Sequence, residues 1–305
     1  MEFFLQQTVN GLTLGSVYAL LALGYSMVYG ILKLLNFAHG EVYMFGAFAG
    51  YGVLTVLGGA SSPVVPVWLL ITLMFAGAIV VSSAIGVALE RFAYRPLREA
   101  PRIASLISAI GASFFLQAAA LLMFGSRSRS YSTPTLVDFS TSIPFGPIRV
   151  WMVRVLVIVT AVVLMVLLTL WVSRTRTGKA VRAVSFDREA AAMMGIDVDK
   201  VIVVTFLIGS ALAGVAGVMV GLVFGRIFHL MGFFAGLKAF TAAVVGGIGS
   251  IPGAMLGGLL IGLAEAYSTG YIGALYQNLI VFGILIVVLL VRPRGLLGRP
   301  ELVKV

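Results

Sequence analysis

The sequence contains no cysteine and very few charged residues. The absence of cysteine among 305 residues excludes disulfide frameworks, thiol chemistry and cysteine-ligated zinc. Asp, Glu, Lys and Arg together make up only 10% of the chain, against about a quarter in ordinary globular proteins. A soluble protein of 32.2 kDa needs far more charge than this to cover its surface. The composition is therefore that of a polytopic membrane protein.

Several classes of function are excluded by what is missing. The net charge of +10 does not indicate nucleic-acid binding, because the basic residues lie between long charge-free runs rather than on one dense face. Only two histidines, His39 and His229, are present, so we expect no metal site. The phosphate-binding pattern G-x-x-x-x-G-K-[ST] is absent, and so are G-x-S-x-G and H-E-x-x-H. We therefore expect no cofactor in this chain and no enzymatic activity.

Charge-free apolar runs recur along the whole chain. Crossing a bilayer takes roughly 20 apolar residues as a helix. The runs of this kind are Val9–Leu32, Val42–Ala60, Val64–Leu89, Ile103–Ser126, Val155–Ser173, Val201–Gly225, Ala239–Ala264 and the shorter Tyr276–Val291. They lack the two-residue alternation of a membrane β-barrel. The sequence predicts an all-α membrane helix bundle with about eight apolar segments, forming a single transmembrane domain over residues 1–305.

Basic residues predict the orientation of the bundle. Three segments, Glu90–Arg102, Ser173–Lys200 and the tail from Arg292 to Lys304, hold 14 of the 21 Lys and Arg residues. Because Lys and Arg are enriched in cytoplasmic loops, we expect these segments to lie in the cytoplasm. The connection Gly125–Val150 is then external.

The run Ala239–Ala264 contains a cluster of helix-breaking residues. Glycines, a serine and a proline between Val245 and Gly253 should interrupt a helix. We expect two half-helices that either re-enter on one side or cross twice with help from Phe228–Lys238; a kinked continuous span is the alternative. Such breaks are tolerated where they line a cavity, so the residues predicted to line a transport path here are Gly246, Gly247, Gly249 and Pro252.

Glycines at four-residue spacing occur in several of the runs. Such pairs let two helix backbones approach closely. They are Gly11 and Gly15, Gly46 and Gly50, Gly217 and Gly221, Gly253 and Gly257, and Gly258 and Gly262. Their positions also suggest two structurally related halves.

Polar residues lie between the first two runs. Asn36, His39 and Glu41 are candidates for the transport path, since ionisable groups within a membrane are costly and often functional. The alternative is that they cap and pack the second helix, with Glu41 complementing the helix dipole from the first turn.

The central basic segment contains a short helix-forming stretch. Glu, Ala and Met favour a helix between Ser185, a good N-cap residue, and Gly195, a good terminator. The sequence predicts a cytoplasmic helix over 185–195, with Met193 and Met194 near its end. Methionine suits surfaces that pack against partners, but an interfacial helix in the lipid headgroups would use the same residues.

This stretch and three further motifs resemble a known family. Glu189-Ala190-Ala191-x-x-x-Gly195 resembles the E-A-A-x-x-x-G loop of permeases in ATP-binding-cassette (ABC) importers. The motifs Asn10-Gly-Leu-x-x-Gly-Ser-x-Tyr-Ala-Leu, Leu35-Asn-Phe-Ala-His-Gly-Glu41 and Gly246-Gly-Ile-Gly-Ser-Ile-Pro-Gly-Ala254 are similar to those of LivH-type permeases of branched-chain amino acid importers.

The resemblance implies a complex in the bacterial inner membrane. It comprises this chain, a second related permease, two ATPase subunits that bind ATP and Mg, and a periplasmic substrate-binding protein. The residues implied to couple the permease to the ATPase are Ser185, Glu189, Ala190, Ala191, Met194 and Gly195. A urea or amide permease of the same family, and a secondary transporter that works without an ATPase, are the alternatives.

Overall fold

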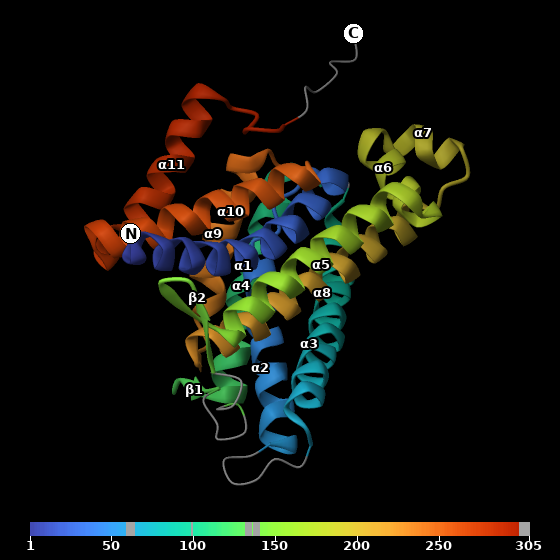
Figure 1. The fold of residues 1–305 in the computed structure, drawn as a ribbon. Coiled ribbons are helices and arrows are strands. Elements are labelled where there is room, and N and C mark those ends of the chain that lie inside the picture. Colours follow the sequence, from blue (N-terminus) through green and yellow to red (C-terminus); the bar gives the residue numbers. More distant parts are fainter. Residues whose placement is uncertain (59–64, 99, 132–135, 137–140, 299–305) are drawn as a thin grey trace.

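The computed structural model describes residues 1–58, 65–98, 100–131, 136 and 141–298 (Figure 1). The helices are α1 (Glu2–Leu32), α2 (His39–Leu57), α3 (Val67–Leu89), α4 (Arg102–Phe124), α5 (Met152–Arg174), α6 (Arg176–Phe186), α7 (Arg188–Met193), α8 (Val198–Phe224), α9 (Met231–Gly246), α10 (Ile251–Tyr267) and α11 (Gln277–Val291). Short π and 3-10 turns extend α3 as η1 (Glu90–Tyr94) and η2 (Arg95–Leu97), and join α10 to α11 as η4 (Ser268–Ile272) and η5 (Ala274–Tyr276).

The remaining regular structure is small. Strand β1 (Arg129–Ser130) pairs with β4 (Arg226–Ile227), and β2 (Ser142–Phe145) pairs with β3 (Ile148–Trp151), both antiparallel. Within the described residues, eight helical segments are long and apolar enough to cross a membrane, and α9 is a shorter apolar helix. The predicted polytopic helix bundle is confirmed.

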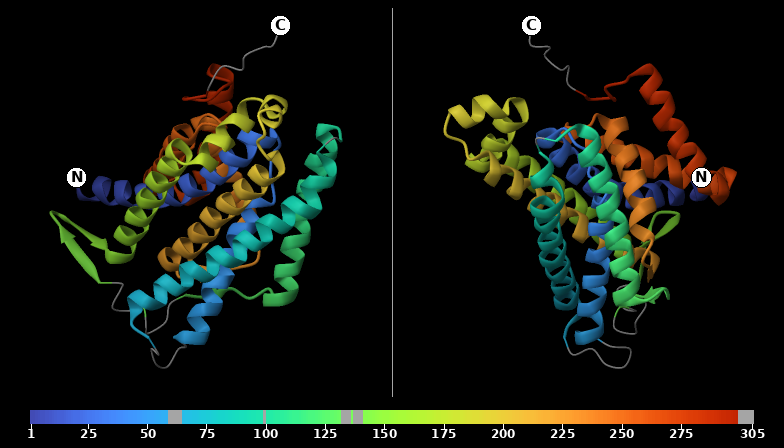
Figure 2. Two further views of the ribbon diagram at one scale, coloured as in Figure 1. Left: turned by 90° about the vertical axis from the view of Figure 1, so that its right-hand side faces the viewer. Right: turned by 180° about the vertical axis from the view of Figure 1, so that it is seen from behind.

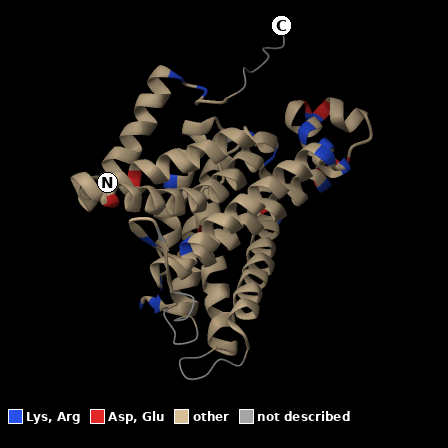
Figure 3. Cartoon of the chain, in the orientation of Figure 1, with Lys and Arg blue, Asp and Glu red and all other residues tan. Residues whose placement is uncertain are grey.

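Basic segments that are distant in the sequence lie together at one end of the bundle. Arg188 of α7 donates to the Ile31 carbonyl at the end of α1. Gly30 lies close to Gly249, and the Leu296 N–H of the tail donates to the Val245 carbonyl over 2.9 Å. We call this the basic end; Figure 3 shows the Lys and Arg residues gathered at α6 and α7 there.

The opposite end carries the strands. The β2–β3 hairpin lies far from α6 and α7 in both views of Figure 2. The three segments assigned to the cytoplasm by their charge therefore meet at one end, as the topology requires. Which side of the membrane that end faces remains a prediction, and residues 299–305 of the basic tail lie outside the described residues.

The predicted break in the run Ala239–Ala264 is confirmed. Helix α9 ends at Gly246 and α10 begins at Ile251. Gly247 and Gly249 between them have φ of 113° and 86°, which are left-handed values that glycine adopts without strain. The Ser250 hydroxyl then caps α10 by accepting from the Gly253 N–H over 3.2 Å, with Pro252 in the first turn. The continuous kinked span is wrong.

Helices α9 and α10 pack against each other as a hairpin. A Cβ atom on Gly257 or Gly246 would collide with the facing backbone, so the two helices are in close contact there. Helix α9 begins at Met231 and so uses most of the stretch Phe228–Lys238. Of the two predicted arrangements, this hairpin favours two crossings, although only α10 with η4 is long enough to span a membrane and α9 is shorter, so the even number of crossings stays a prediction.

Small residues bring two other helix pairs together. In α1, Gly15 faces Leu259 of α10, where a Cβ atom would lie 2.8 Å from the Leu259 Cα. In α8, Gly214 faces Ser82 of α3, where a Cβ atom would lie 2.5 Å from the hydroxyl oxygen. The close backbone approach predicted for Gly15 is therefore confirmed, and α1 also lies close to α8, where a Cβ atom on Gly24 would lie 3.0 Å from the Gly209 carbonyl oxygen.

Candidate functional site

The segment predicted as one helix over 185–195 is two helices, and the predicted cap at Ser185 is wrong. Ser185 lies in the last turn of α6 and its hydroxyl donates to the Arg182 carbonyl over 2.7 Å. Asp187 has an extended backbone that ends α6, and its carboxylate accepts from the N–H groups of Glu189 and Ala190 at 3.0 and 3.1 Å. A carboxylate that satisfies two free N–H groups at a helix start makes Asp187 the N-cap of α7.

The predicted terminator Gly195 is confirmed. Its φ is 81°, and its N–H donates to the Ala192 carbonyl over 2.9 Å. The next N–H, of Ile196, reaches back to the Ala191 carbonyl over 3.1 Å. These two bonds form a Schellman motif, which turns the chain sharply from α7 into α8.

The α6–α7 segment, residues 176–195, presents apolar side chains to its surroundings. Phe186, Met193 and Met194 are 79%, 82% and 82% exposed. Glu189 and Ala190 are also exposed, and we call these five residues the outer face of the α6–α7 segment. Ala191, also expected at the coupling surface, is only 4% exposed and packs inside the chain.

A groove runs along this segment. It is open, has a volume of about 450 Å³ and lies between α6 and α7. Its lining includes Lys179, Arg182, Phe186, Ala190 and Met194. The segment therefore offers an apolar surface with basic residues on one side.

Arg188 connects α7 to the body of the bundle. Its Nε donates to the Ile31 carbonyl over 2.9 Å, and its terminal nitrogen donates to the same oxygen. Burial, and then the positive charge of Arg98, lower the pKa of the Arg188 guanidinium from its ordinary value. This contact was not predicted, because no local sequence pattern places Arg188 near α1.

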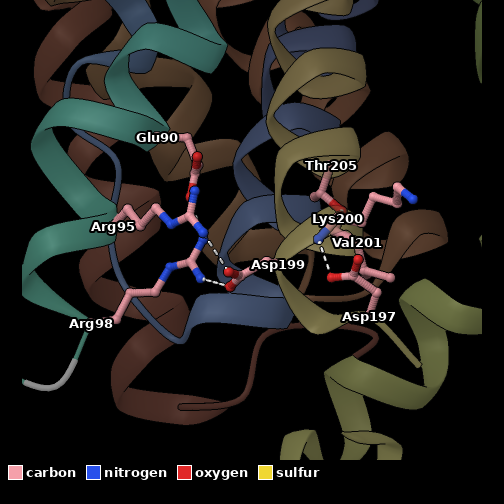
Figure 4. Close-up of polar contacts among 8 residues, drawn as sticks. All are labelled: Glu90, Arg95, Arg98, Asp197, Asp199, Lys200, Val201 and Thr205. Carbon is pink, nitrogen blue, oxygen red and sulfur yellow. Dashed lines mark hydrogen bonds and ion pairs between the residues drawn. The ribbon is translucent and has the colours of Figure 1, made fainter. Parts of the chain in front are cut away.

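A second polar cluster lies where α8 begins (Figure 4). Asp199 accepts from Arg95 over 2.6 Å and also from Arg98, whose guanidinium pairs in addition with Glu90. The Glu90 side chain is 1% exposed and that of Arg98 is 15% exposed. This cluster joins the extended end of α3 to the start of α8.

The polar residues at the start of α2 and in the loop before it are buried. Asn36, His39 and Glu41 are 3%, 1% and 0% exposed. The Asn36 side chain accepts from the Tyr94 hydroxyl over 2.7 Å, and the Glu41 carboxylate accepts from Ser113 and Gln117 of α4 at 3.1 and 2.9 Å. His39 packs edge-on against Tyr25. Each residue joins α2 or the preceding loop to a neighbouring helix, as the packing alternative predicts.

The glycines of the α9–α10 junction do not lie with those polar residues. They lie at the basic end, where the tail covers the end of α9: the Leu297 N–H donates to the Gly246 carbonyl over 2.8 Å. Gly246 and Gly247 are buried beneath the tail, whereas Gly249 and Pro252 are exposed. The predicted path residues thus form two separate groups.

An ion pair inside the bundle was missed by the sequence analysis. Lys238 of α9 donates to Glu265 of α10 over 2.6 Å, and the Tyr18 hydroxyl of α1 donates to the other carboxylate oxygen over 2.9 Å. Both charged side chains are less than a tenth exposed. Charges of opposite sign in two neighbouring apolar stretches are the signal that could have found it.

Comparison with known proteins identifies the family. The family model described as the permease component of branched-chain amino acid transport systems matches residues 7–290. The chain is 49% identical over 304 residues to BraD, a high-affinity branched-chain amino acid transport system permease protein of Pseudomonas aeruginosa, covering 99% of this chain and 98% of the relative.

Two further relatives mark the range of similarity. The chain is 48% identical to LivH of Escherichia coli, of the same description, with 99% and 98% of the two chains covered. A fructose import permease protein of Rhizobium meliloti, FrcC, is 35% identical over a shorter stretch, 33% of this chain and 31% of the relative. The family match and the near full-length relatives show that the chain belongs to the permease components of branched-chain amino acid transport systems.

Proposed function

We propose that this chain is a membrane-spanning permease subunit of an ABC importer that carries branched-chain amino acids across the bacterial inner membrane. A second related permease, two ATPase subunits and a periplasmic substrate-binding protein complete the complex. ATP and Mg bind to the ATPase subunits. The substrate is inferred from BraD and LivH, branched-chain amino acid permeases that share nearly half of the residues over nearly the full length.

The observation that carries the coupling part of the proposal is the outer face of the α6–α7 segment. Three large apolar side chains of this segment, Phe186, Met193 and Met194, are about four-fifths exposed. Burying each against a partner would contribute about 1.5–3 kcal/mol. Exposed Glu189 and the basic residues of the groove add polar partners that fix the orientation of docking.

The mechanism is alternating access. ATP binding and hydrolysis in the partner subunits move the docked α6–α7 segment, and the segment moves the helices to which it is attached. The path then opens in turn toward the binding protein and toward the cytoplasm. Gly195 allows the sharp turn that holds α7 beside the start of α8.

The transport path is proposed to lie between the two permeases. Residues that line such a path are exposed in a single chain, whereas Asn36, His39 and Glu41 are almost fully buried. Their burial favours a packing role, and a role in the path would require a different arrangement of α2 and α4. Gly249 and Pro252, exposed at the basic end, remain the candidates for the cytoplasmic part of the path.

Co-purification with the ATPase tests the proposal. We expect the double variant Met193→Gln/Met194→Gln to lose the ATPase while staying in the membrane at the normal level, because glutamine keeps the side-chain length but removes the apolar contact. Lys200→Gln, at an exposed position on α8, is the matched control and should keep the ATPase. An unchanged yield of ATPase with the double variant would indicate an interfacial helix in the headgroups instead.

Uptake into liposomes distinguishes the alternatives. The complex with its loaded binding protein should take up leucine, isoleucine or valine only when ATP is supplied. Uptake of urea in place of these amino acids would favour the urea permease. Uptake by this chain alone without ATP would favour a secondary transporter.

A further inference from the structure

Arg188 has a different environment from the rest of the E-A-A motif. It directly precedes the exposed Glu189, yet its own side chain is partly buried and donates to the end of α1. Arg188 and Ala191 are three residues apart and therefore share one face of α7. That face is the inner one, because Ala191 is buried.

The partner of Arg188 is a backbone group that the helix itself leaves free. Ile31 belongs to the last turn of α1, where carbonyl groups have no intrahelical donor. Two nitrogens of the guanidinium converge on this one oxygen. A positive charge at a helix carboxyl end also interacts favourably with the helix dipole.

A separate contact joins the other side of the segment to α3. The chain passes from Gly195 into α8, where Asp199 is paired with Arg95 of η2 and with Arg98, which follows η2 (Figure 4). Asp197 caps α8 by accepting from the Lys200 N–H over 3.0 Å. The α6–α7 segment is therefore connected to α3 and α8 through the backbone and this charged cluster.

Both connections lead to helices that are closely packed with their neighbours. Helix α1 is packed against α10 by Gly15 and Gly262, and α3 is packed against α8 by Gly86 and Gly214. Added Cβ atoms at these glycines would collide with the facing helix, so each pair is closely interlocked. Close-packed helices of this kind move together rather than deforming.

We propose that Arg188 is a positioning residue that transmits the movement of the docked α6–α7 segment to α1 and to the helices packed against α1. The inference rests on the proposed function, because it requires an ATPase that moves the segment.

The chemistry requires arginine in particular. A guanidinium presents several donors in a fixed plane, so two of them reach the Ile31 carbonyl at once. Lysine keeps the charge and one donor in line with that oxygen, whereas methionine keeps only the apolar stem. The variants Arg188→Lys and Arg188→Met therefore separate the contribution of the hydrogen bonds from that of packing.

The experiment measures transport per ATP hydrolysed in liposomes that contain the assembled complex and loaded binding protein. We expect Arg188→Met to lower this ratio about tenfold, which is the factor that corresponds to one charge-assisted hydrogen bond. Arg188→Lys should recover part of the ratio. The ATPase should remain bound in both variants, because Arg188 does not belong to the outer face.

Arg176→Met is the matched control, since Arg176 is an exposed arginine in the first turn of α6. It should keep the wild-type ratio. A ratio for Arg188→Met within twofold of wild type would overturn the inference, and so would loss of the ATPase from both Arg188 variants, which would make Arg188 a docking residue. Failure of the wild-type chain to bind an ATPase would instead refute the proposed function.

Discussion

Removing Glu265 should destabilise the bundle strongly, because it leaves Lys238 without its carboxylate partner. The Lys238 amine lies 2.6 Å from one oxygen of Glu265, and the Tyr18 hydroxyl donates to the other over 2.9 Å. The side chains of the ion pair are 9% and 7% exposed, so water cannot replace the lost partner. Breaking a buried ion pair from one side costs about 3–5 kcal/mol, and we expect Glu265→Leu to fall in this range.

The double variant Lys238→Met/Glu265→Leu separates the cost of an unpaired charge from the value of the pair. Replacing both partners with apolar residues of similar volume is often neutral, so the double variant should be more stable than Glu265→Leu alone. Unfolding by sodium dodecyl sulfate in mixed micelles, followed by circular dichroism, measures the free energy of unfolding of Glu265→Leu and of the double variant. Lys200→Met, at an exposed position, should change stability by less than about 0.5 kcal/mol. The reasoning would be refuted if the double variant lost as much free energy of unfolding as the single variants Lys238→Met and Glu265→Leu lose in sum.

Three further changes test the break, the tail and the topology. Gly246→Ala should cost about 1–3 kcal/mol in the same assay, because its Cβ would collide with the Gly253 backbone, whereas Gly111→Ala meets no atom within 4 Å and should be neutral or stabilising. Leu297→Pro removes the N–H that donates to the end of α9 and should cost about 1 kcal/mol, measured in the same way. Because the chain has no cysteine, single cysteines at Ser185 and Ser130 should be labelled only from the cytoplasm and only from outside, respectively; labelling of Ser185 from outside would contradict the orientation.

The apolar runs of the sequence predicted the helices well, and the errors at their ends have a common cause. The run that contains α9 was begun at Ala239 because Lys238 is charged, but α9 begins at Met231. The same run was ended at Ala264 because Glu265 is charged, but α10 continues to Tyr267. A search for charge-free runs stops at every charge. Such a search does not detect that these two charges form an ion pair with each other inside the bundle.

The candidate site could be predicted where the backbone conformation requires one type of residue. It could not be predicted where two nearby residues are equally suited to the same role. Gly195 was found because few other residues adopt a left-handed conformation at a helix end. The start of α7 was missed because Ser185 and Asp187 are both good N-cap residues, and only the extended backbone at Asp187 separates α6 from α7. The contact of Arg188 with Ile31 joins residues 157 positions apart, and no local pattern encodes it.

The two alanines of the E-A-A motif differ in their exposure, which the motif does not predict. Ala190 is exposed and Ala191 is 4% exposed, although the two are identical and adjacent. A helix of six residues made largely of alanine has no apolar stripe, so its sequence cannot show which face turns inward. The inner face is set instead by contacts outside the motif, namely the Arg188 side chain on α1 and the Ile196 N–H on the Ala191 carbonyl. The motif therefore identifies the segment that we propose to meet the ATPase, whereas the tertiary contacts decide which of its residues are exposed.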